Sequence, residues 1–149
     1  MILHRALAML ATTVLVTACG ANMESKTDAA AETPKAEKKV YGKITKVDVG
    51  PTIDETMVKA GHDVFETKCS ACHKMDERYV GPPLGAVTTR RTPEYVMNMI
   101  LDTETMVRND DTVKCLLQEY LVQMPNQSVD EKDARNVLEY LRKEGTERK

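Results

Sequence analysis

The chain has 149 residues, of which 42% are hydrophobic and 30% are charged, and its formal net charge is −2. It has no basic patch, so nucleic acid is excluded as a partner. With one phenylalanine and no tryptophan, a small domain made from this sequence is only marginally stable on its own core.

Residues 1–18 have the pattern of an export signal. A short basic start is followed by an apolar stretch that is too short to span a bilayer, and the stretch ends in Thr17-Ala18-Cys19. Small residues directly before a cysteine resemble a bacterial lipobox, which predicts cleavage before Cys19 and lipidation of that cysteine. The alternative is an ordinary secretory signal with an incidental cysteine. Two or more acyl chains would anchor the protein to the membrane on its extracytoplasmic, periplasmic side.

Residues 19–53 are expected to connect this lipid anchor to a folded domain at residues 54–149. The stretch from Gly20 to Lys39 lacks apolar periodicity and is rich in Ala, Glu and Lys, which predicts a flexible stalk. The stretch from Val40 to Pro51 differs, because apolar residues alternate along part of it. These residues are Ile44, Val47 and Val49. They predict a short extended segment laid against the domain.

From Asp54 onward the apolar periodicity is helical, and no strand pattern appears. The predicted helix starts are Asp54, Thr92-Pro93, Asp110 or Asp111, and Ser128 with Glu131 as a capping box. The first helix should end near Cys69 and the last before Gly145. The apolar face of the third helix, which starts at Asp110 or Asp111, comprises Val113, Leu116, Leu117, Tyr120 and Leu121. We therefore expect an all-α domain of about four to five helices.

The run Cys69-Ser70-Ala71-Cys72-His73 is the attachment sequence of a c-type haem. Each cysteine sulfur can add to one vinyl group of the porphyrin, and the histidine is then placed to bind the iron axially. The other cysteines and histidines are Cys19, Cys115, His4 and His62. They provide no second ligand pair for zinc, and the βαβ pattern of a thioredoxin is absent. We therefore predict one covalent haem c, which also supplies the apolar bulk that the core lacks.

Further motifs, in the same order along the chain, resemble class I cytochrome c. They are Gly61 with Phe65, Gly81-Pro82-Pro83-Leu84, Met124-Pro125, and Tyr140-Leu141. The resemblance implies that the first and last helices cross at Gly61. It also implies that the carbonyl of Pro82 accepts a hydrogen bond from His73 and so fixes the ring.

The chain departs from mitochondrial-type cytochromes in two respects. It lacks their dense lysine content, and it has no tryptophan on the side of the haem propionates. Tyr95, Arg90 and Arg91 either serve the propionates instead or are a packing tyrosine and two solvated arginines.

The methionines after the haem motif are Met75, Met97, Met99, Met106 and Met124. The first is too close to His73 to reach the opposite face of the iron, and the next two lie in a predicted helix where packing explains them. Of the other two, Met124 precedes Pro125 between two helices, so no helix must be broken to aim its sulfur. The family pattern agrees, and Met124 is the predicted distal ligand.

A His73/Met124 pair fills both axial positions and favours Fe(II), which predicts one-electron transfer rather than enzymatic catalysis. The absence of a candidate distal acid-base histidine argues against a peroxidase. Two alternatives stay open. The first is a haem enzyme or gas sensor with a labile Met124 bond, and the second is a permanent cytochrome subunit of a respiratory complex.

The expected partners are redox proteins: a quinol-oxidising complex upstream, and a terminal reductase or oxidase downstream. Without its signal the chain carries 20 basic and 23 acidic residues, a net charge of −3 before the propionates. A lipoprotein with Gly81-Pro82-Pro83-Leu84 and Met124-Pro125-Asn126 is similar to small cytochromes that accompany nitrous oxide reductase or cytochrome oxidases.

Overall fold

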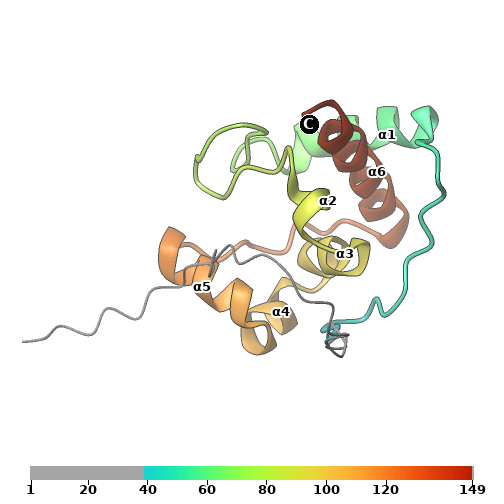
Figure 1. Ribbon diagram of the computed structural model, residues 1–149. Helices are drawn as coiled ribbons and strands as arrows, with labels where there is room; N and C mark the ends of the chain where they lie inside the picture. Colours follow the sequence, from blue (N-terminus) through green and yellow to red (C-terminus); the bar gives the residue numbers. More distant parts are fainter. Residues whose placement is uncertain (1–38, 149) are drawn as a thin grey trace, which may run out of the picture. The chain divides into compact units, whose positions relative to one another are not determined.

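The computed structural model describes residues 39–148, and all regular structure within this part of the chain is helical (Figure 1). The helices are α1 (Glu55–Lys68), α2 (Val87–Arg90), α3 (Pro93–Leu101), α4 (Thr103–Asn109), α5 (Asp111–Tyr120) and α6 (Glu131–Glu147). The all-α prediction is confirmed. The structure adds α2 and α4, whose 4 and 7 residues are too few to give a clear apolar period.

Residues 1–38 lie outside the described part of the chain, and with them lie the predicted export signal, Cys19 and most of the predicted stalk. Among the helices that are described, none combines the length and apolar character needed to cross a membrane.

Three predicted helix starts are confirmed by their caps. The Asp54 carboxylate accepts hydrogen bonds from the second and third residues of α1, at 2.8 and 3.1 Å. Thr92 caps α3, whose first residue is Pro93, and Asp110 caps α5 by accepting from the N–H of Val113 at 3.1 Å. These caps satisfy N–H groups that a helix leaves without a partner in its first turn.

The predicted ends of the last helix are wrong at both termini. Its cap is Asp130, which accepts from the N–H of Asp133 at 2.7 Å, whereas Ser128 has a left-handed backbone with φ of 52° and cannot begin the helix. At the other end, α6 continues through Gly145. A Cβ at Gly145 would lie 2.7 Å from the hydroxyl oxygen of Thr88, so glycine there permits close packing on α2 and does not end the helix.

The helices α1 and α6 pack against each other more extensively than any other pair (Figure 1). A Cβ on Gly61 of α1 would lie 2.0 Å from the carbonyl oxygen of Asn136 on α6. The predicted crossing of the first and last helices at Gly61 is therefore confirmed. Side chains of α1, α3 and α6 form the core around this crossing: Phe65, Val96, Met97, Ile100, Ala134, Val137, Leu138, Tyr140 and Leu141.

The segment before α1 lies against the helical domain. The buried side chain of Asn98 on α3 accepts from the N–H of Ile44 at 2.9 Å and donates to the carbonyl of Ile44 at 2.7 Å. The Asn98 amide thus makes with Ile44 the two backbone hydrogen bonds that a neighbouring β-strand would make. Val47 donates to a carboxylate oxygen of Glu94, and the apolar side chains of the segment pack on the core.

A buried carboxylate that no sequence pattern indicates fixes the end of this segment. Glu139 of α6 is 1% exposed and accepts hydrogen bonds from the Asp54 amide, Arg135 and Arg142 at 2.6 to 3.1 Å. Arg142 also donates to the carbonyl of Gly50 at 2.8 Å. Burial alone would raise the pKa of Glu139, but these donors outweigh it and lower the pKa.

We expect Glu139→Gln to lower the free energy of unfolding by about 2 kcal/mol near neutral pH, the usual value of hydrogen bonds to a charged group. The pKa of Glu139 is lower in the folded protein than in the unfolded chain. The stabilisation that its ionised carboxylate provides is therefore complete above about pH 4.3 and is lost as the pH falls through the folded pKa. Urea unfolding of both proteins at pH 7 and at pH 3 measures this. An equal difference at the two pH values would contradict the ionised state of Glu139.

Candidate haem site

The haem motif forms a tight turn directly after α1. The N–H groups of Cys72 and His73 both donate to the carbonyl of Cys69, at 3.0 and 2.9 Å. The following loop returns to this turn, because the N–H of Gly81 donates to the carbonyl of Cys72 at 2.8 Å. These backbone bonds place the loop against the histidine.

The side chain of His73 is 9% exposed and is held in one orientation. Its Nδ1 lies 2.9 Å from the carbonyl oxygen of Pro82, so Nδ1 donates the hydrogen bond that the family resemblance implies and Nε2 is the nitrogen left for a metal. Burial lowers the pKa of His73, against a smaller opposite effect of the Pro82 bond. The neutral ring, which is the form that binds metals, is thereby favoured.

Gly81 makes room for this ring. A Cβ at position 81 would lie 2.5 Å from Cε1 and 2.9 Å from Nδ1 of His73. In the sequence Gly81 is only part of a motif, and nothing there predicts this contact. The one indication in the sequence is the position of this glycine directly before Pro82, the residue whose carbonyl accepts the hydrogen bond from the His73 ring.

The two cysteines of the motif are half-buried thiols that are not joined in a disulfide. Burial and the neighbouring charge of Cys72 raise the pKa of Cys69 to about 11, so this thiol stays protonated near neutral pH. Within residues 39–148, no group of three or more His, Cys, Asp or Glu side chains is arranged so that it could hold a metal ion.

Met124 lies half-buried in the non-helical segment between α5 and α6, where the sequence placed it. Met97 is 2% exposed and belongs to the core around α1, α3 and α6. Met106 is 1% exposed and lines the cavity described below. The assignment of Met124 as the distal ligand stays a prediction.

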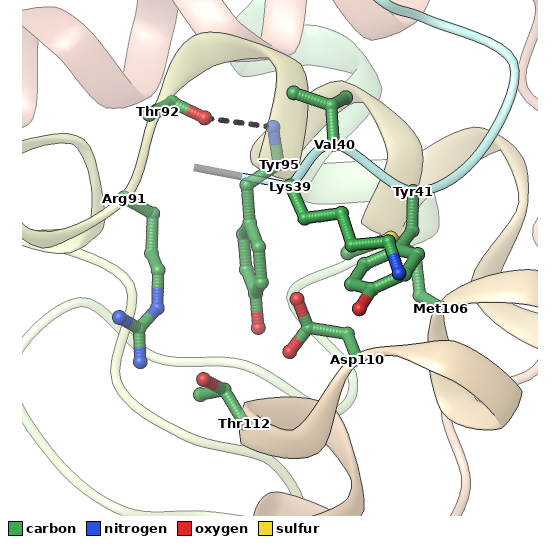
Figure 2. A pocket seen from close by; sticks show the side chains of 9 residues that line it. All are labelled: Lys39, Val40, Tyr41, Arg91, Thr92, Tyr95, Met106, Asp110 and Thr112. Atoms are coloured by element: carbon green, nitrogen blue, oxygen red, sulfur yellow. Dashed lines mark hydrogen bonds between the residues drawn. The ribbon is translucent and has the colours of Figure 1, made fainter. Parts of the chain in front are cut away.

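A cavity of about 170 Å³ lies between α3 and the start of α5 (Figure 2). The hydroxyl of Tyr95 lies in its wall, is buried, and has no hydrogen-bond partner among the described residues. The guanidinium of Arg91 lies over the Tyr95 ring, 5.2 Å from its centroid, while Arg90 is exposed. Burial and the charge of Asp110 raise the pKa of Tyr95, so its hydroxyl is a hydrogen-bond donor.

These residues fit a covalently attached haem. Two reduced cysteines and a buried histidine with one nitrogen committed to a carbonyl form the donor set for attachment and for one axial bond. The Tyr95 hydroxyl, which has no hydrogen-bond partner among the described residues, and the guanidinium of Arg91 beside it are suited to a carboxylate, since a buried hydroxyl is costly without a partner.

The family model for cytochrome c matches residues 58–144, which contain the haem motif, the Pro82 loop and Met124. The chain belongs to the cytochrome c family. As a member of this family it carries one covalently bound haem c with its iron, and its general function is that of a haem-binding electron carrier.

Solved structures agree with this assignment. A cytochrome c from Rhodothermus marinus is 39% identical to the chain, with a TM-score of 0.71, and the match covers 72% of this chain and 92% of that one. An engineered cytochrome c from the same organism, bound to a carbene intermediate, is 40% identical, with a TM-score of 0.66 and coverages of 70% and 91%. Among curated proteins no significant match is found.

Proposed function

We propose that the chain is a membrane-tethered, extracytoplasmic one-electron carrier with a His/Met-ligated c-type haem. Cys69 and Cys72 hold the haem covalently, and His73 and Met124 are the axial ligands. The observation that carries the proposal is the hydrogen bond from Nδ1 of His73 to Pro82, 2.9 Å long, because it fixes the ring for axial binding. The haem supplies a reversible one-electron couple of its iron.

The protein's own residues tune and shield this couple. The carbonyl of Pro82 increases the basicity of His73, and Gly81 lets the loop close over the ring. Met124 would supply a soft thioether ligand to the iron, which would favour the reduced state and block access to the metal. Tyr95 and Arg91 supply a hydroxyl donor and a positive charge for a propionate.

A redox titration of the holoprotein tests this function directly. We expect a single reversible one-electron wave, and no rapid binding of carbon monoxide to the ferrous form near neutral pH. Rapid binding by the unmodified protein would instead support the alternative of a haem enzyme or gas sensor. The observation that favours this alternative is that an engineered relative holds a carbene intermediate.

The proposed partners are a quinol-oxidising complex as donor and a terminal reductase or oxidase as acceptor, with nitrous oxide reductase as one example of the acceptor class. The net charge of −3 after removal of the signal supports protein partners and not nucleic acid. A permanent role as one subunit of a respiratory complex is the second alternative. Purification of the native protein alone or in a stable complex distinguishes a mobile carrier from a subunit.

The proposed anchor is a lipid on Cys19, a residue that lies outside the described part of the chain. We expect the wild-type protein to fractionate with membranes, because two or more acyl chains give stable anchoring. Cys19→Ser should be released as soluble holoprotein outside the cytoplasm, provided that it is still exported and cleaved. Mass spectrometry of the amino terminus is the control. A soluble wild-type protein with an unblocked terminus would disprove the anchor.

A further inference from the structure

Met124 lies in a segment whose hydrogen bonds within the described part of the chain are all local. Residues 122–129 connect α5 to α6, and the hydrogen bonds they make join residues of this segment that are two positions apart. No hydrogen bond to another described element fixes the middle of the segment. The position of Met124 therefore depends on how the two ends of the segment are held.

The two ends of this segment are held very differently. At its carboxyl end, Val129 contacts the core, and α6 packs on α1, α2 and α3. At its amino end, the segment follows α5, and among the described helices α5 packs only on α4. The end that follows α5 is thus the one at which a further attachment matters most.

Arg78 provides this attachment. Its guanidinium donates to a carboxylate oxygen of Glu119 at 2.7 Å and to the backbone carbonyl of the same residue at 2.8 Å. It also lies over the ring of Tyr120, the last residue of α5, 4.0 Å from the ring centroid. Hydrogen bonds from a guanidinium to a carboxylate are charge-assisted, and a cation over an aromatic ring adds a further attraction. These contacts from one side chain hold the last turn of α5.

Arg78 belongs to the loop that contains Pro82, the hydrogen-bond partner of His73. Backbone hydrogen bonds of 2.8 to 3.0 Å fix this loop: those from Gly81 to Cys72, from Leu84 to Lys74 and from Gly85 to Met75. An ion pair of 2.7 Å between Asp76 and Arg148 ties the same loop to the residue that follows α6. Because its loop is fixed, Arg78 can hold the end of a helix in place.

We propose that Arg78 is a positioning residue for the distal ligand, which limits how often the Met124 sulfur leaves the iron by holding the end of α5 to the His73 loop. This inference rests on the proposed function, because it takes Met124 as an axial ligand. An exposed ion pair by itself contributes little. Arg78 differs from such a pair, because it adds carbonyl and ring contacts and joins residues 41 positions apart.

The rate at which the iron–sulfur bond opens measures this role. Imidazole can bind the ferric iron only after Met124 has left, so at high imidazole concentration the binding rate levels off at the opening rate. Stopped-flow mixing of the full-length ferric holoprotein with imidazole, in detergent solution, gives this plateau rate. We expect Arg78→Gln to raise the plateau rate by about tenfold. The sulfur-to-iron charge-transfer band should persist, because Met124 is still the resting ligand.

Arg108→Gln is the matched control. Arg108 also pairs with a glutamate, Glu104, at 2.6 Å, and both side chains are more than half exposed, as those of Arg78 and Glu119 are. The Arg108 pair differs in lying within a single helix, α4, where it ties nothing to the haem loop. This variant should leave the plateau rate within about twofold of the parent.

Glu119→Gln tests the same contact from the other side. It should raise the plateau rate by less than Arg78→Gln does, because the carbonyl and ring contacts of Arg78 persist. The variant that combines Arg78→Gln with Glu119→Gln should open no faster than Arg78→Gln alone, since the two residues act through one contact. Effects that multiply in the combined variant would contradict this coupling and overturn the inference.

The remaining outcomes separate this inference from the proposed function. A plateau rate that Arg78→Gln leaves unchanged, or that Arg108→Gln raises equally, would overturn the positioning role and leave the carrier function intact. An opening rate that follows only the urea midpoint of each variant would assign the effect to general loss of stability, and would also overturn the inference. A parent that lacks the charge-transfer band and binds imidazole without a plateau has no Met124 bond to open, which would refute the proposed His/Met ligation itself.

Discussion

Replacing Met124 by alanine will abolish the sulfur-to-iron charge-transfer band of the ferric protein and lower its reduction potential by an amount on the order of 0.1 V. The soft thioether favours Fe(II), so its loss favours the oxidised state. Without it the sixth position is open, and carbon monoxide should bind the ferrous form rapidly. Visible spectroscopy, a redox titration and stopped-flow mixing with carbon monoxide provide the three measurements.

Met106→Leu is the control for this prediction. Met106 is the other methionine that the sequence left as a candidate ligand, and it is 1% exposed, so a leucine of similar volume keeps the core filled. The charge-transfer band, the potential and the exclusion of carbon monoxide should all persist. If Met106→Leu loses the band and Met124→Ala keeps it, the ligand is Met106 and the family pattern has been misapplied to this chain.

The Gly61→Ala variant will lose about 3 kcal/mol or more of unfolding free energy, the upper part of the range for overpacking a core. The added Cβ would meet the Asn136 carbonyl oxygen at 2.0 Å, and that atom belongs to the backbone of α6, so relief requires the two helices to separate. For a domain of this size the expected fall in Tm is roughly 10 °C or more. Thermal unfolding followed by circular dichroism measures it.

Gly50→Ala is the matched control for Gly61→Ala. The nearest atom to a Cβ at Gly50 is the carbonyl oxygen of Thr52 at 3.9 Å, an ordinary contact. The same chemical change should therefore alter the Tm little at this position. Equal losses from the two substitutions would show that the loss at Gly61 does not come from the contact between α1 and α6.

The local parts of the structure were predictable because their causes are local. Asp54, Thr92 and Asp110 are caps whose side chains bond N–H groups two or three residues away, and each begins a helix as predicted. The prediction at Ser128 is wrong, because Asp130 two residues later is also a capping residue and the left-handed backbone at Ser128 leaves no sign in the sequence.

Contacts between distant residues were predictable only where a family motif encoded them. The pairing of His73 with Pro82 and the contact of Gly61 with α6 were implied by the resemblance and are present. Asn98 with Ile44 and Glu139 with Asp54 are equally close pairs, but no motif names them. Separations of 54 and 85 residues leave no periodic signal that a sequence pattern could reveal.

By itself the sequence determined the haem chemistry, because Cys69, Cys72 and His73 lie within five residues and covalent attachment depends only on their spacing. It also determined the all-helical class, through apolar periodicity, and the family, through its ordered motifs. The tertiary structure alone decided which polar groups are buried in pairs and which apolar groups stay exposed. Glu139 is an ordinary helical glutamate in the sequence and a buried ion-pair centre in the fold, while Leu121 is an ordinary core leucine in the sequence and the most exposed large hydrophobic residue described. Burial depends on what the rest of the chain packs against, and that is a property of the whole fold.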